Sequence, residues 1–299
     1  MRTLYYDDCF NIFPQIGKSA VDLILCDPPY GTIKGCPIEG YKNRDLSWDE
    51  ALDTNKMFEE SERVLRQNGK LLLFSQEPYS SNLITHKNKS GLKFCYKLIW
   101  IKDHFANGLM SKKAPVNYFE EILVFTKIHD SANLNPLRNY FSTLISKLGI
   151  LPSEVNEKLG HRKMEHAFYT TSTQFKVPSK SAYEEFLNVF DLKQNALSYD
   201  KLVEIDYKPK VTFNLVNNQK YKSNVLFYKK DYTRFHPTQK PIKLIEDLIY
   251  TYSNQVDIVL DFCMGSGTTG VACKNLNRLF IGIEKEEKCF NIAKERIGE

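Results

Sequence analysis

The sequence of 299 residues predicts an α/β protein with a mostly parallel sheet covered by helices on both faces, and with a smaller, mainly helical domain inserted into it. Two observations lead to this prediction. Short, almost continuously apolar strands alternate with helical patterns at both ends of the chain, which is typical of buried parallel strands. The middle of the chain has short helical patterns instead. We expect residues 1–128 and 231–299 to form one domain and residues 129–230 to form the insert.

The first 128 residues contain five strand patterns, at residues 3–6, 21–26, 70–75, 97–102 and 121–127. Between the second and third strands, residues 48–67 have apolar side chains at helical spacing. This pattern stops at Asn68-Gly69, a common signal for the C-terminal end of a helix. The sequence therefore predicts a strand, helix, strand order in this part of the sheet.

The last third repeats this order, with a helix at 241–253, a strand at 256–262, a helix at 268–276, a strand at 279–284 and a helix at 286–297. The middle has helical patterns at 137–148, 152–160 and 179–190. The first two, joined through Gly149, are compatible with a helix-turn-helix, as is any small helical hairpin. Residues 208–230 suit a hairpin or a return strand.

The composition is that of an ordinary globular protein, with 42% hydrophobic and 26% charged residues. No window reaches the ~18 to 20 consecutive apolar residues of a membrane span. Acids at Asp7 and Asp8 stand where a signal peptide needs an apolar run, so we expect a cytoplasmic protein that does not contact a membrane. The seven scattered cysteines contain no C-x-x-C pair, and we expect neither a disulfide framework nor a metal site.

The net charge of +5 is unevenly distributed. Residues 129–230 contain 15 Lys and Arg against 10 Asp and Glu, and residues 87–113 contain seven lysines against the single acid Asp103. A localised basic surface is what a phosphate-binding face requires, although lysine-rich loops are also often merely solvated.

The motif Asp27-Pro28-Pro29-Tyr30 follows the apolar strand at residues 21–26 directly. Its two prolines restrict the backbone and remove two N–H donors, so the chain leaves the sheet in a stiff, extended turn. Ligands bind at the carboxyl ends of strands in an open parallel sheet. This turn places a carboxylate, free carbonyls and a ring at such an end. The same residues would also suit a loop in which Asp27 caps the next segment and Tyr30 packs.

A second motif, LDFCMGSGTTG at residues 260–270, has the order strand, glycine turn, helix. Its glycines allow the backbone to approach a ligand, and the helix N-terminus offers N–H groups to an anionic one. Glu284 ends the next strand, about 20 residues further on, where a ribose-binding carboxylate is expected. The motif therefore indicates an adenosine-containing cofactor, and its spacing alone leaves an NAD dehydrogenase open.

Four motifs together resemble the amino-methyltransferases of DNA: D-P-P-Y, the glycine motif, FIGIE at residues 280–284 and HPTQKP at residues 236–241. Because D-P-P-Y precedes the glycine motif, the order is similar to that of the β class of N6-adenine and N4-cytosine methyltransferases. The resemblance covers residues 1–128 and 231–299. It implies a Rossmann-like methyltransferase fold with a mixed sheet, and S-adenosylmethionine as the cofactor.

The resemblance implies roles for individual residues. The catalytic residues would be Asp27, Pro28, Pro29 and Tyr30. The cofactor-binding residues would be Asp8, Asp261, Phe262, Cys263, Gly265, Gly267, Thr268, Thr269, Glu284, Thr238 and Lys240. Cys263 departs from the family pattern, which commonly has phenylalanine at that place. This departure leaves open which side chain packs on the cofactor.

The resemblance also implies a flipped-out base, because an amino group inside a duplex cannot be reached. Tyr30 would stack on that base, and the Asp27 carboxylate and Pro28 carbonyl would accept hydrogen bonds from its amino group before a direct methyl transfer. Asp27 favours N6 of adenine, since enzymes that act on N4 of cytosine more often have serine there. The alternatives are an N4-cytosine enzyme, a catalytically silent DNA-binding protein, and an RNA or protein amino-methyltransferase.

The expected partner is double-stranded DNA, bound by the insert through Arg162 and Lys163 and by the basic segment through Lys112 and Lys113. For the first pair, a solvated basic turn is an equal alternative. A homodimer and a cognate restriction enzyme are further partners that the resemblance leaves open.

Overall fold

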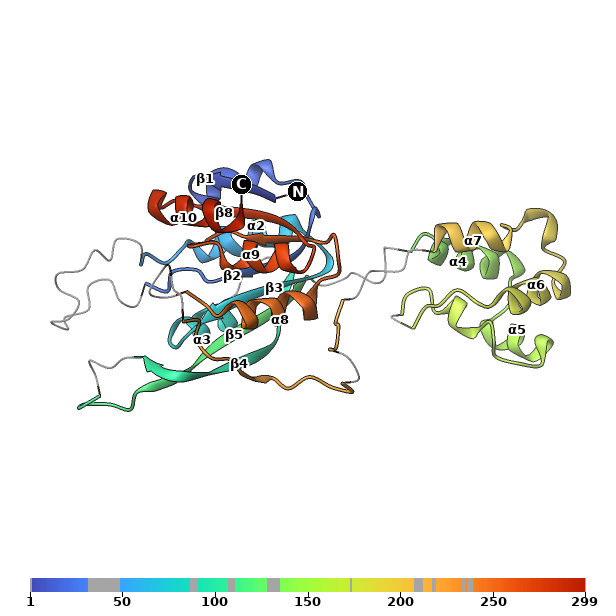
Figure 1. Cartoon of the computed structure of the whole chain (residues 1–299). Coiled ribbons are helices and arrows are strands. Elements are labelled where there is room, and N and C mark those ends of the chain that lie inside the picture. The colour runs from blue at the N-terminus through green and yellow to red at the C-terminus, as the bar shows by residue number, and fades with distance from the viewer. Residues whose placement is uncertain are drawn as a thin grey trace. The chain divides into compact units, whose positions relative to one another are not determined.

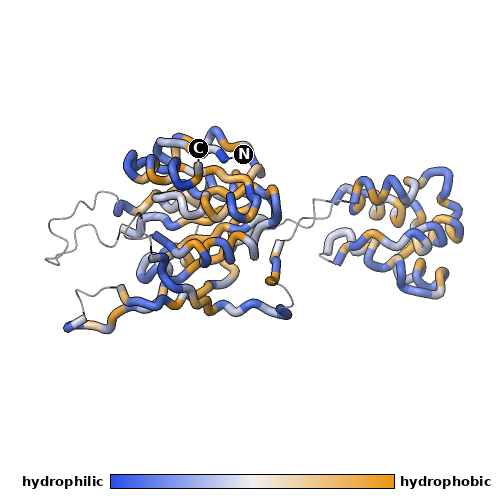
Figure 2. Tube along the Cα trace, in the orientation of Figure 1, coloured by the Kyte–Doolittle hydropathy of each residue, from blue (hydrophilic) through white to orange (hydrophobic). Residues whose placement is uncertain are grey.

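The computed structural model of the chain describes residues 2–31, 49–86, 91–106, 111–127, 135–172, 174–206, 212–216, 219–232, 235 and 239–298. The chain forms two compact units, a larger one of Met1–Ile128 with Val211–Glu299 and a smaller one of His129–Lys210. In both units the apolar residues are concentrated on the inward sides of the elements (Figure 2). Each unit therefore has a core of its own.

The larger unit is built on an eight-stranded sheet (Figure 1) with the order β1-β8-β7-β2-β3-β5-β4-β6. The strands are β1 (Arg2–Tyr6), β2 (Val21–Cys26), β3 (Leu65–Ser75), β4 (Leu92–Ala106), β5 (Asn117–Lys127), β6 (Val225–Phe227), β7 (Ile258–Asp261) and β8 (Leu279–Glu284). Strand β5 is antiparallel to both of its neighbours, and the other neighbouring pairs are parallel. The predicted mixed sheet, assembled from both ends of the chain, is confirmed.

Helices cover both faces of this sheet. One face packs on α1 (Cys9–Ile12), α2 (Thr54–Val64) and α3 (Tyr79–Thr85), and the other on α8 (Ile242–Tyr252), α9 (Thr268–Asn275) and α10 (Glu287–Ile297). Strand β3 shows the division, because Leu71 and Leu73 belong to the first core whereas Leu72 and Phe74 belong to the second. This alternation follows from the two-residue period of a strand.

Two predicted boundaries are wrong. Helix α2 ends at Val64, and Asn68-Gly69 lies inside β3. The register against β2 changes here, from Val21 opposite Leu65 to Leu23 opposite Lys70, and Asn68 takes a φ of +59°. The Asn-Gly pair thus forms an irregularity of the strand instead of a helix end.

The second difference concerns the insert, which was expected to extend to residue 230. Strand β6 pairs with β4, with Ile99 opposite Val225, and residues 211–230 therefore belong to the larger unit. The predicted return strand is part of the sheet.

The smaller unit is helical. It contains α4 (Leu137–Leu148), α5 (Pro152–Leu159), α6 (Lys180–Val189) and α7 (Tyr199–Ile205), with short 3₁₀ turns at Glu165–Phe168 and Lys193–Asn195. Gly149, with a φ of +64°, ends α4 and connects it to α5. The core includes Phe141, Tyr183 and Phe186, each fully buried.

No helix in the described parts of either unit is both long and apolar enough to cross a bilayer.

Candidate active site

The D-P-P-Y turn leaves the carboxyl end of β2, which lies between β7 and β3 in the middle of the sheet. The Tyr30 hydroxyl donates a hydrogen bond of 2.9 Å to Asp27 Oδ1. The Tyr30 ring stacks on Tyr79, with centroids 5.5 Å apart and planes inclined by 29°. Burial, followed by the charge of Asp27, raises the pKa of Tyr30 well above its ordinary value, so the phenol stays a donor to the carboxylate.

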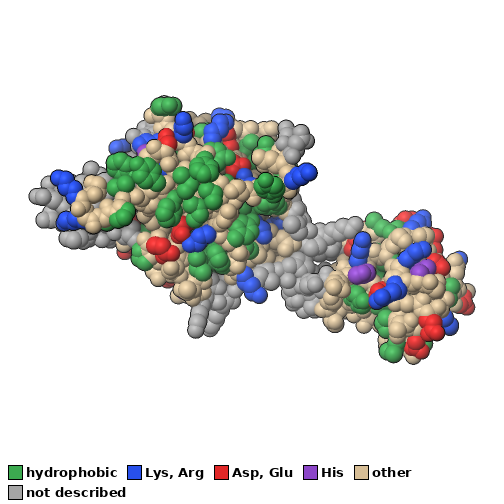
Figure 3. Space-filling view, turned by 90° about the horizontal axis from the view of Figure 1, so that it is seen from below, with side chains coloured by type: hydrophobic (Ala, Val, Ile, Leu, Met, Phe, Trp, Pro, Cys, Tyr) green, Lys and Arg blue, Asp and Glu red, His purple; other side chains and the backbone are tan. Residues whose placement is uncertain are grey.

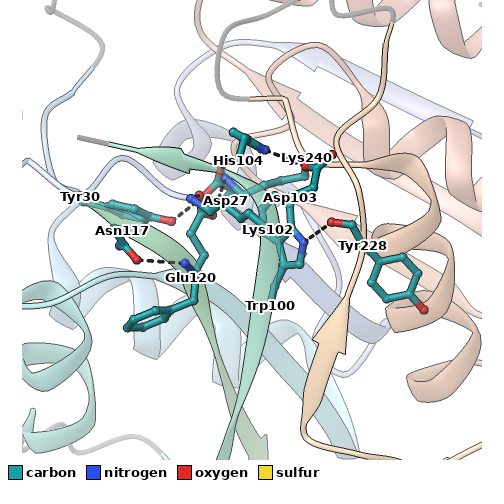
Figure 4. Close-up of polar contacts among 11 residues, drawn as sticks. Asp27, Tyr30, Trp100, Lys102, Asp103, His104, Asn117, Glu120, Tyr228 and Lys240 are labelled. Atoms are coloured by element: carbon teal, nitrogen blue, oxygen red, sulfur yellow. Dashed lines mark hydrogen bonds and ion pairs between the residues drawn. The ribbon is translucent and has the colours of Figure 1, made fainter. Parts of the chain in front are cut away.

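The other oxygen of Asp27 meets Lys240, which immediately precedes the residue that caps α8. Figure 4 shows the Lys240 ammonium between two carboxylates, those of Asp27 and Glu120. It contacts Asp27 Oδ2 and lies 3.3 Å from Glu120 Oε2. It also lies 4.9 Å from the centroid of the Phe74 ring. Lys240, which we expected to bind the cofactor, thus contacts the carboxylate of the D-P-P-Y turn.

Glu120 and Lys102, which the sequence analysis did not identify, complete this cluster. Glu120 lies on β5 and Lys102 on the neighbouring β4, and their charged atoms are 2.6 Å apart. Burial alone would raise the pKa of Glu120, but Lys240 and Lys102 hold it below its ordinary value. A detectable signal was present, because acids are unusual in an apolar strand such as FEEILVF at residues 119–125.

The glycine turn follows β7, the strand that pairs with β2. Asp261 is 3% exposed and accepts hydrogen bonds from Thr269 Oγ1 at 2.6 Å and from the Cys263 N–H at 3.2 Å. Burial raises the pKa of Asp261 to about 7. Gly267 has a φ of +78°, and a Cβ there would lie 2.8 Å from Ala293 Cβ. Asp261 and Thr269 hold the turn closed, and Gly267 allows α10 to approach it.

A carboxylate lies beside this turn at the end of β8. Glu284 Oε2 accepts a hydrogen bond of 2.8 Å from the Gly265 N–H, and its Oε1 accepts one of 2.8 Å from the Glu286 N–H. Burial raises the pKa of Glu284 above its ordinary value. A Cβ on Gly265 would meet no atom of the described residues within 4 Å, so the space beside this glycine, whose N–H binds the carboxylate, is open. An open space bordered by a carboxylate and a glycine turn suits a ribose-containing ligand.

Asp8 lies at the neighbouring strand end, because β1 pairs with β8 up to Tyr6 opposite Glu284. Its Oδ1 caps α1 by accepting a hydrogen bond of 2.9 Å from the Phe10 N–H. The structure thus brings Asp8, Glu284 and the glycine turn to the carboxyl ends of adjacent strands.

Other predicted cofactor residues have different surroundings. Phe262 is 2% exposed, and its ring centroid lies 5.5 Å from that of Phe13, so this side chain belongs to the core. Cys263 is partly exposed. The Thr268 hydroxyl accepts a hydrogen bond of 3.2 Å from Arg296. Thr238 lies outside the described residues.

The predicted DNA contacts are all at the surface. Lys112 and Lys113 are exposed at the start of the segment that leads into β5. Arg162 and Lys163 are exposed on the smaller unit, where Arg162 pairs with Glu165 through a 2.8 Å hydrogen bond from its Nε. Part of the Arg162 charge is therefore already compensated.

A D-P-P-Y turn next to a glycine turn on a Rossmann-like mixed sheet defines an enzyme class, the methyltransferases that modify amino groups. A family model described as DNA methylase, of the N6/N4 type, matches residues 21–295. The chain belongs to this N6/N4 DNA methyltransferase family.

Curated relatives agree with this assignment. The type II methyltransferase M.HpaI of Haemophilus parainfluenzae is 26% identical over 297 residues, covering 99% of this chain and 74% of the relative. The DNA adenine methyltransferase YhdJ of Escherichia coli K12 is 26% identical over 304 residues, covering 99% and 82%.

Solved structures share the fold. The M1.HpyAVI–SAM complex has a TM-score of 0.56 at 22% identity and covers both chains completely. The cytosine-N4-specific PvuII DNA methyltransferase has a TM-score of 0.55 at 12% identity, covering all of this chain and 88% of that one.

Proposed function

We propose that this DNA methyltransferase uses S-adenosylmethionine to methylate the exocyclic N6 of a flipped-out adenine. The observation that carries the proposal is the position of Asp27, a carboxylate held by Tyr30 at the carboxyl end of a central strand. The glycine turn follows the adjacent strand β7. The acceptor for an amino group and the proposed cofactor site are therefore at neighbouring strand ends.

The residues around Gly265 fit the cofactor. The Glu284 carboxylate, already oriented by two backbone N–H groups, would accept hydrogen bonds from the ribose hydroxyls. Asp8, at the end of the adjacent strand, and the partly exposed Cys263 would border the same ligand. Gly265 lets the backbone approach it, Gly267 lets α10 pack against the turn, and Asp261, Thr268 and Thr269 keep the turn in shape. When bound, S-adenosylmethionine supplies the electrophilic methyl group.

The D-P-P-Y turn would hold the base. Tyr30, backed by Tyr79, offers a ring on which an unstacked base can stack. The Asp27 carboxylate and the Pro28 carbonyl, with Pro29 stiffening the turn, would accept hydrogen bonds from the two amino hydrogens. These bonds raise the electron density on the nitrogen and direct its lone pair, so catalysis rests on positioning and electrostatics.

Two features support adenine over cytosine. The residue before the two prolines is Asp27, and the relative YhdJ is named a DNA adenine methyltransferase. The alternative product is N4-methylcytosine, which the structural similarity to the N4-specific PvuII enzyme leaves open.

The test is methylation of duplex DNA with labelled S-adenosylmethionine, followed by digestion to nucleosides and mass spectrometry. We expect N6-methyladenine from the wild type. Asp27→Ala should lower kcat by about 10²- to 10³-fold or more, because it removes an acceptor that acts in the transition state. Cofactor affinity should change by less than about threefold, because the two partners that lose Asp27, Tyr30 and Lys240, lie at the D-P-P-Y turn and not at the glycine turn.

Asp53→Ala is the matched control, because Asp53 is an exposed carboxylate that caps α2. It should cost about 1 kcal/mol of stability and leave kcat unchanged. Normal activity of Asp27→Ala would overturn the site, and N4-methylcytosine in the digest would overturn the choice of base.

The phosphate contacts are proposed to come mainly from the larger unit. Residues 211–230 contain four lysines and no acid, whereas residues 129–210 contain 11 Lys and Arg against 10 Asp and Glu, a difference of only +1. The basic excess predicted for the insert therefore lies outside the helical unit and, because Lys222 pairs with Asp247, comes from Lys220, Lys229 and Lys230.

The larger unit also exposes aromatic rings at the ends of β4 and β5. Phe105 and Tyr118 end β4 and begin β5, are 51% and 47% exposed, and have ring centroids 6.0 Å apart. Figure 3 shows hydrophobic side chains with Lys and Arg among them on one face of the larger unit. Exposed rings with lysines suit a surface that contacts bases and phosphates.

The β4–β5 segments and the residues after β6 are joined by hydrogen bonds. The Lys230 N–H donates to Asp103 Oδ1 at 3.2 Å, and Trp100 Nε1 donates to the Tyr228 carbonyl at 2.9 Å. Lys112, Lys113, Lys229 and Lys230 thus belong to segments next to Lys102 of the active site. The helical unit would contribute target recognition, with a smaller electrostatic share from Arg162 and Lys163.

A further inference from the structure

Four charges of alternating sign form a row at the active site, buried at its Lys102 end and 29% exposed at Asp27: Asp27, Lys240, Glu120 and Lys102 (Figure 4). They come from four separate segments, namely the end of β2, the residues before α8, strand β5 and strand β4. The side chains of Lys102, Lys240 and Glu120 are 4%, 10% and 16% exposed. Charges this deeply buried are costly unless each has a partner, so the row must be considered as one unit.

The row contains a conflict with the proposed chemistry. Lys240 occupies Asp27 Oδ2, while Tyr30 donates to Oδ1. A substrate amino group also needs an acceptor on this carboxylate. The Lys240 ammonium must therefore share Asp27 with the substrate or shift away from it.

Glu120 resolves this conflict, because it gives Lys240 a second carboxylate at 3.3 Å. Lys240 can move its hydrogen bonds toward Glu120 without becoming an unpaired buried cation. Lys102, 2.6 Å from the other oxygen of Glu120, fixes the position of that second acceptor. The Lys240 ammonium then keeps a carboxylate partner whether or not Asp27 binds the substrate.

We propose that Glu120 and Lys102 are positioning residues that control how strongly Lys240 holds Asp27, and so how available the Asp27 carboxylate is to the substrate amino group. The proposal rests on the proposed catalytic role of Asp27. It assigns Lys240 to the carboxylate and not to the cofactor.

The strands provide a matched control. Glu121 is adjacent to Glu120 on β5 and therefore points to the opposite face of the sheet. It pairs with Lys97 of β4 at 2.6 Å, the same length as the pair between Lys102 and Glu120. Glu121→Gln and Lys97→Gln break an equivalent cross-strand pair away from Asp27.

The experiment compares Glu120→Gln and Lys102→Gln with these two controls, using steady-state methylation of duplex DNA between pH 5 and 9. Glu120→Gln removes the negative charge of the second acceptor, so Lys240 stays on Asp27, and kcat should fall about 10- to 100-fold. The KM for DNA and the affinity for S-adenosylmethionine should change by less than about threefold, since neither ligand meets Glu120 in this proposal. Glu120→Asp, which keeps the charge, should restore part of the lost kcat.

The pH profile separates positioning from a general loss of structure. Among the described residues, the titratable groups that interact with Asp27 include Tyr30, Tyr79, Cys26, Asp261 and Lys240, and Glu120 shares the Lys240 ammonium with it. Removing the Glu120 charge favours the ionised carboxylate, so the acid limb of kcat should move to lower pH. Removing the Lys102 charge should move it to higher pH. The control variants should not move it.

The proposal is overturned if Glu120→Gln matches Glu121→Gln in kcat and in the acid limb while Asp27→Ala is inactive. If Asp27→Ala keeps its activity, the site itself is wrong, which is a different result. Thermal melting and cofactor binding of each variant identify any that does not fold. If Glu120→Gln does not fold, Lys102→Gln still tests the proposal, because it should shift the acid limb of kcat in the opposite direction.

Discussion

The two units differ in how they use charged residues. In the larger unit, charged side chains are buried at the active site: Asp261 at the glycine turn, and Lys102 and Glu120 beside the D-P-P-Y turn. In the helical unit, the ion pairs between Lys201 and Glu204 and between Lys180 and Glu184 lie at the surface, and the buried Arg138 guanidinium donates hydrogen bonds to backbone carbonyls. Surface pairs of this kind contribute at most about 1 kcal/mol each, so the helical unit depends mainly on its apolar core.

This contrast indicates that the chemistry belongs to the larger unit. The proposed catalytic and cofactor residues in the described parts of the chain come from the larger unit, and the lysine excess of residues 211–230 belongs to it as well. The helical unit has a core but is almost neutral. It is better suited to reading a shape or a base edge than to neutralising phosphates.

The largest effect is expected in the core of the helical unit. Phe141 is fully buried and packs against Phe168 and Tyr183. Phe141→Ala should destabilise that unit by about 3–5 kcal/mol, because it removes a large ring and leaves a cavity. Thermal unfolding followed by calorimetry should show the loss.

If the two units are independent cores, Phe141→Ala should leave cofactor binding to the larger unit within about twofold of wild type, because the glycine turn belongs to a separate core. If the free energy of cofactor binding fell by as much as the free energy of unfolding, the two units would fold as one and would not have independent cores. Val203→Ala, at a side chain that is 54% exposed in the same unit, is the control. It should cost less than about 0.5 kcal/mol.

The second prediction uses the buried carboxyl group of the larger unit. Burial raises the pKa of Asp261 to about 7, above its value in the unfolded chain. The folded state therefore binds more protons than the unfolded state between these two values, and stability falls as pH rises through this window. Between pH 5 and 8 the contribution should be about 2–3 kcal/mol, taking about 1.4 kcal/mol per pKa unit.

Asp261→Asn removes this titration. As pH rises, the unfolding free energy of the wild type should therefore fall relative to that of the variant. Urea denaturation at pH 5, 6, 7 and 8 measures it. Glu120, whose pKa is lowered, titrates below this range and has the opposite sign. A difference that is constant with pH would mean that Asp261 is already ionised in the folded state.

The sequence was sufficient for the sheet because its signals are local. The apolar run before Asp27 and the glycines after Asp261 each define a strand and the turn that follows it. Pairing both ends of the chain into one sheet then followed from the strand and helix order. The prediction of a helix end at Asn68-Gly69 was wrong because the same pair suits either a helix end or an irregularity of a strand. The pairing of β3 with β2 determines that it is the second.

The charged cluster could not be predicted in the same way. Lys240 and Asp27 are 213 positions apart, and Glu120 meets Lys102 only because β4 and β5 pair with Trp100 opposite Glu120. The register between β4 and β5 brings Glu120 and Lys102 together, and a local sequence pattern does not encode that register. The boundary at residue 230 was wrong for a similar reason, since three residues of β6 join the sheet edge far from the other strands in sequence.

The smallest expected effect tests the charge contrast between the units directly. Lys112→Glu with Lys113→Glu reverses two exposed charges next to β5, and Arg162→Glu with Lys163→Glu reverses two on the helical unit. If the larger unit carries the phosphate contacts, the first pair should weaken DNA binding by about 10- to 100-fold near physiological salt. It should also reduce the slope of log K against log salt by about 2. The second pair should weaken binding by less than about threefold, because Arg162 is already compensated by Glu165.

Fluorescence anisotropy with a labelled duplex, between about 50 and 200 mM salt, measures both quantities for both pairs. Each double variant changes the net charge by the same amount, so a general electrostatic effect would move both slopes equally. Equal slopes would remove the distinction between the units. A larger change for Arg162 and Lys163 would place the phosphate contacts on the helical unit, and the near-neutral charge of that unit would then hide a local basic site. If the salt slope changes more for the Lys112 and Lys113 pair than for the Arg162 and Lys163 pair, the duplex lies along the same segments that hold Lys102 and Glu120.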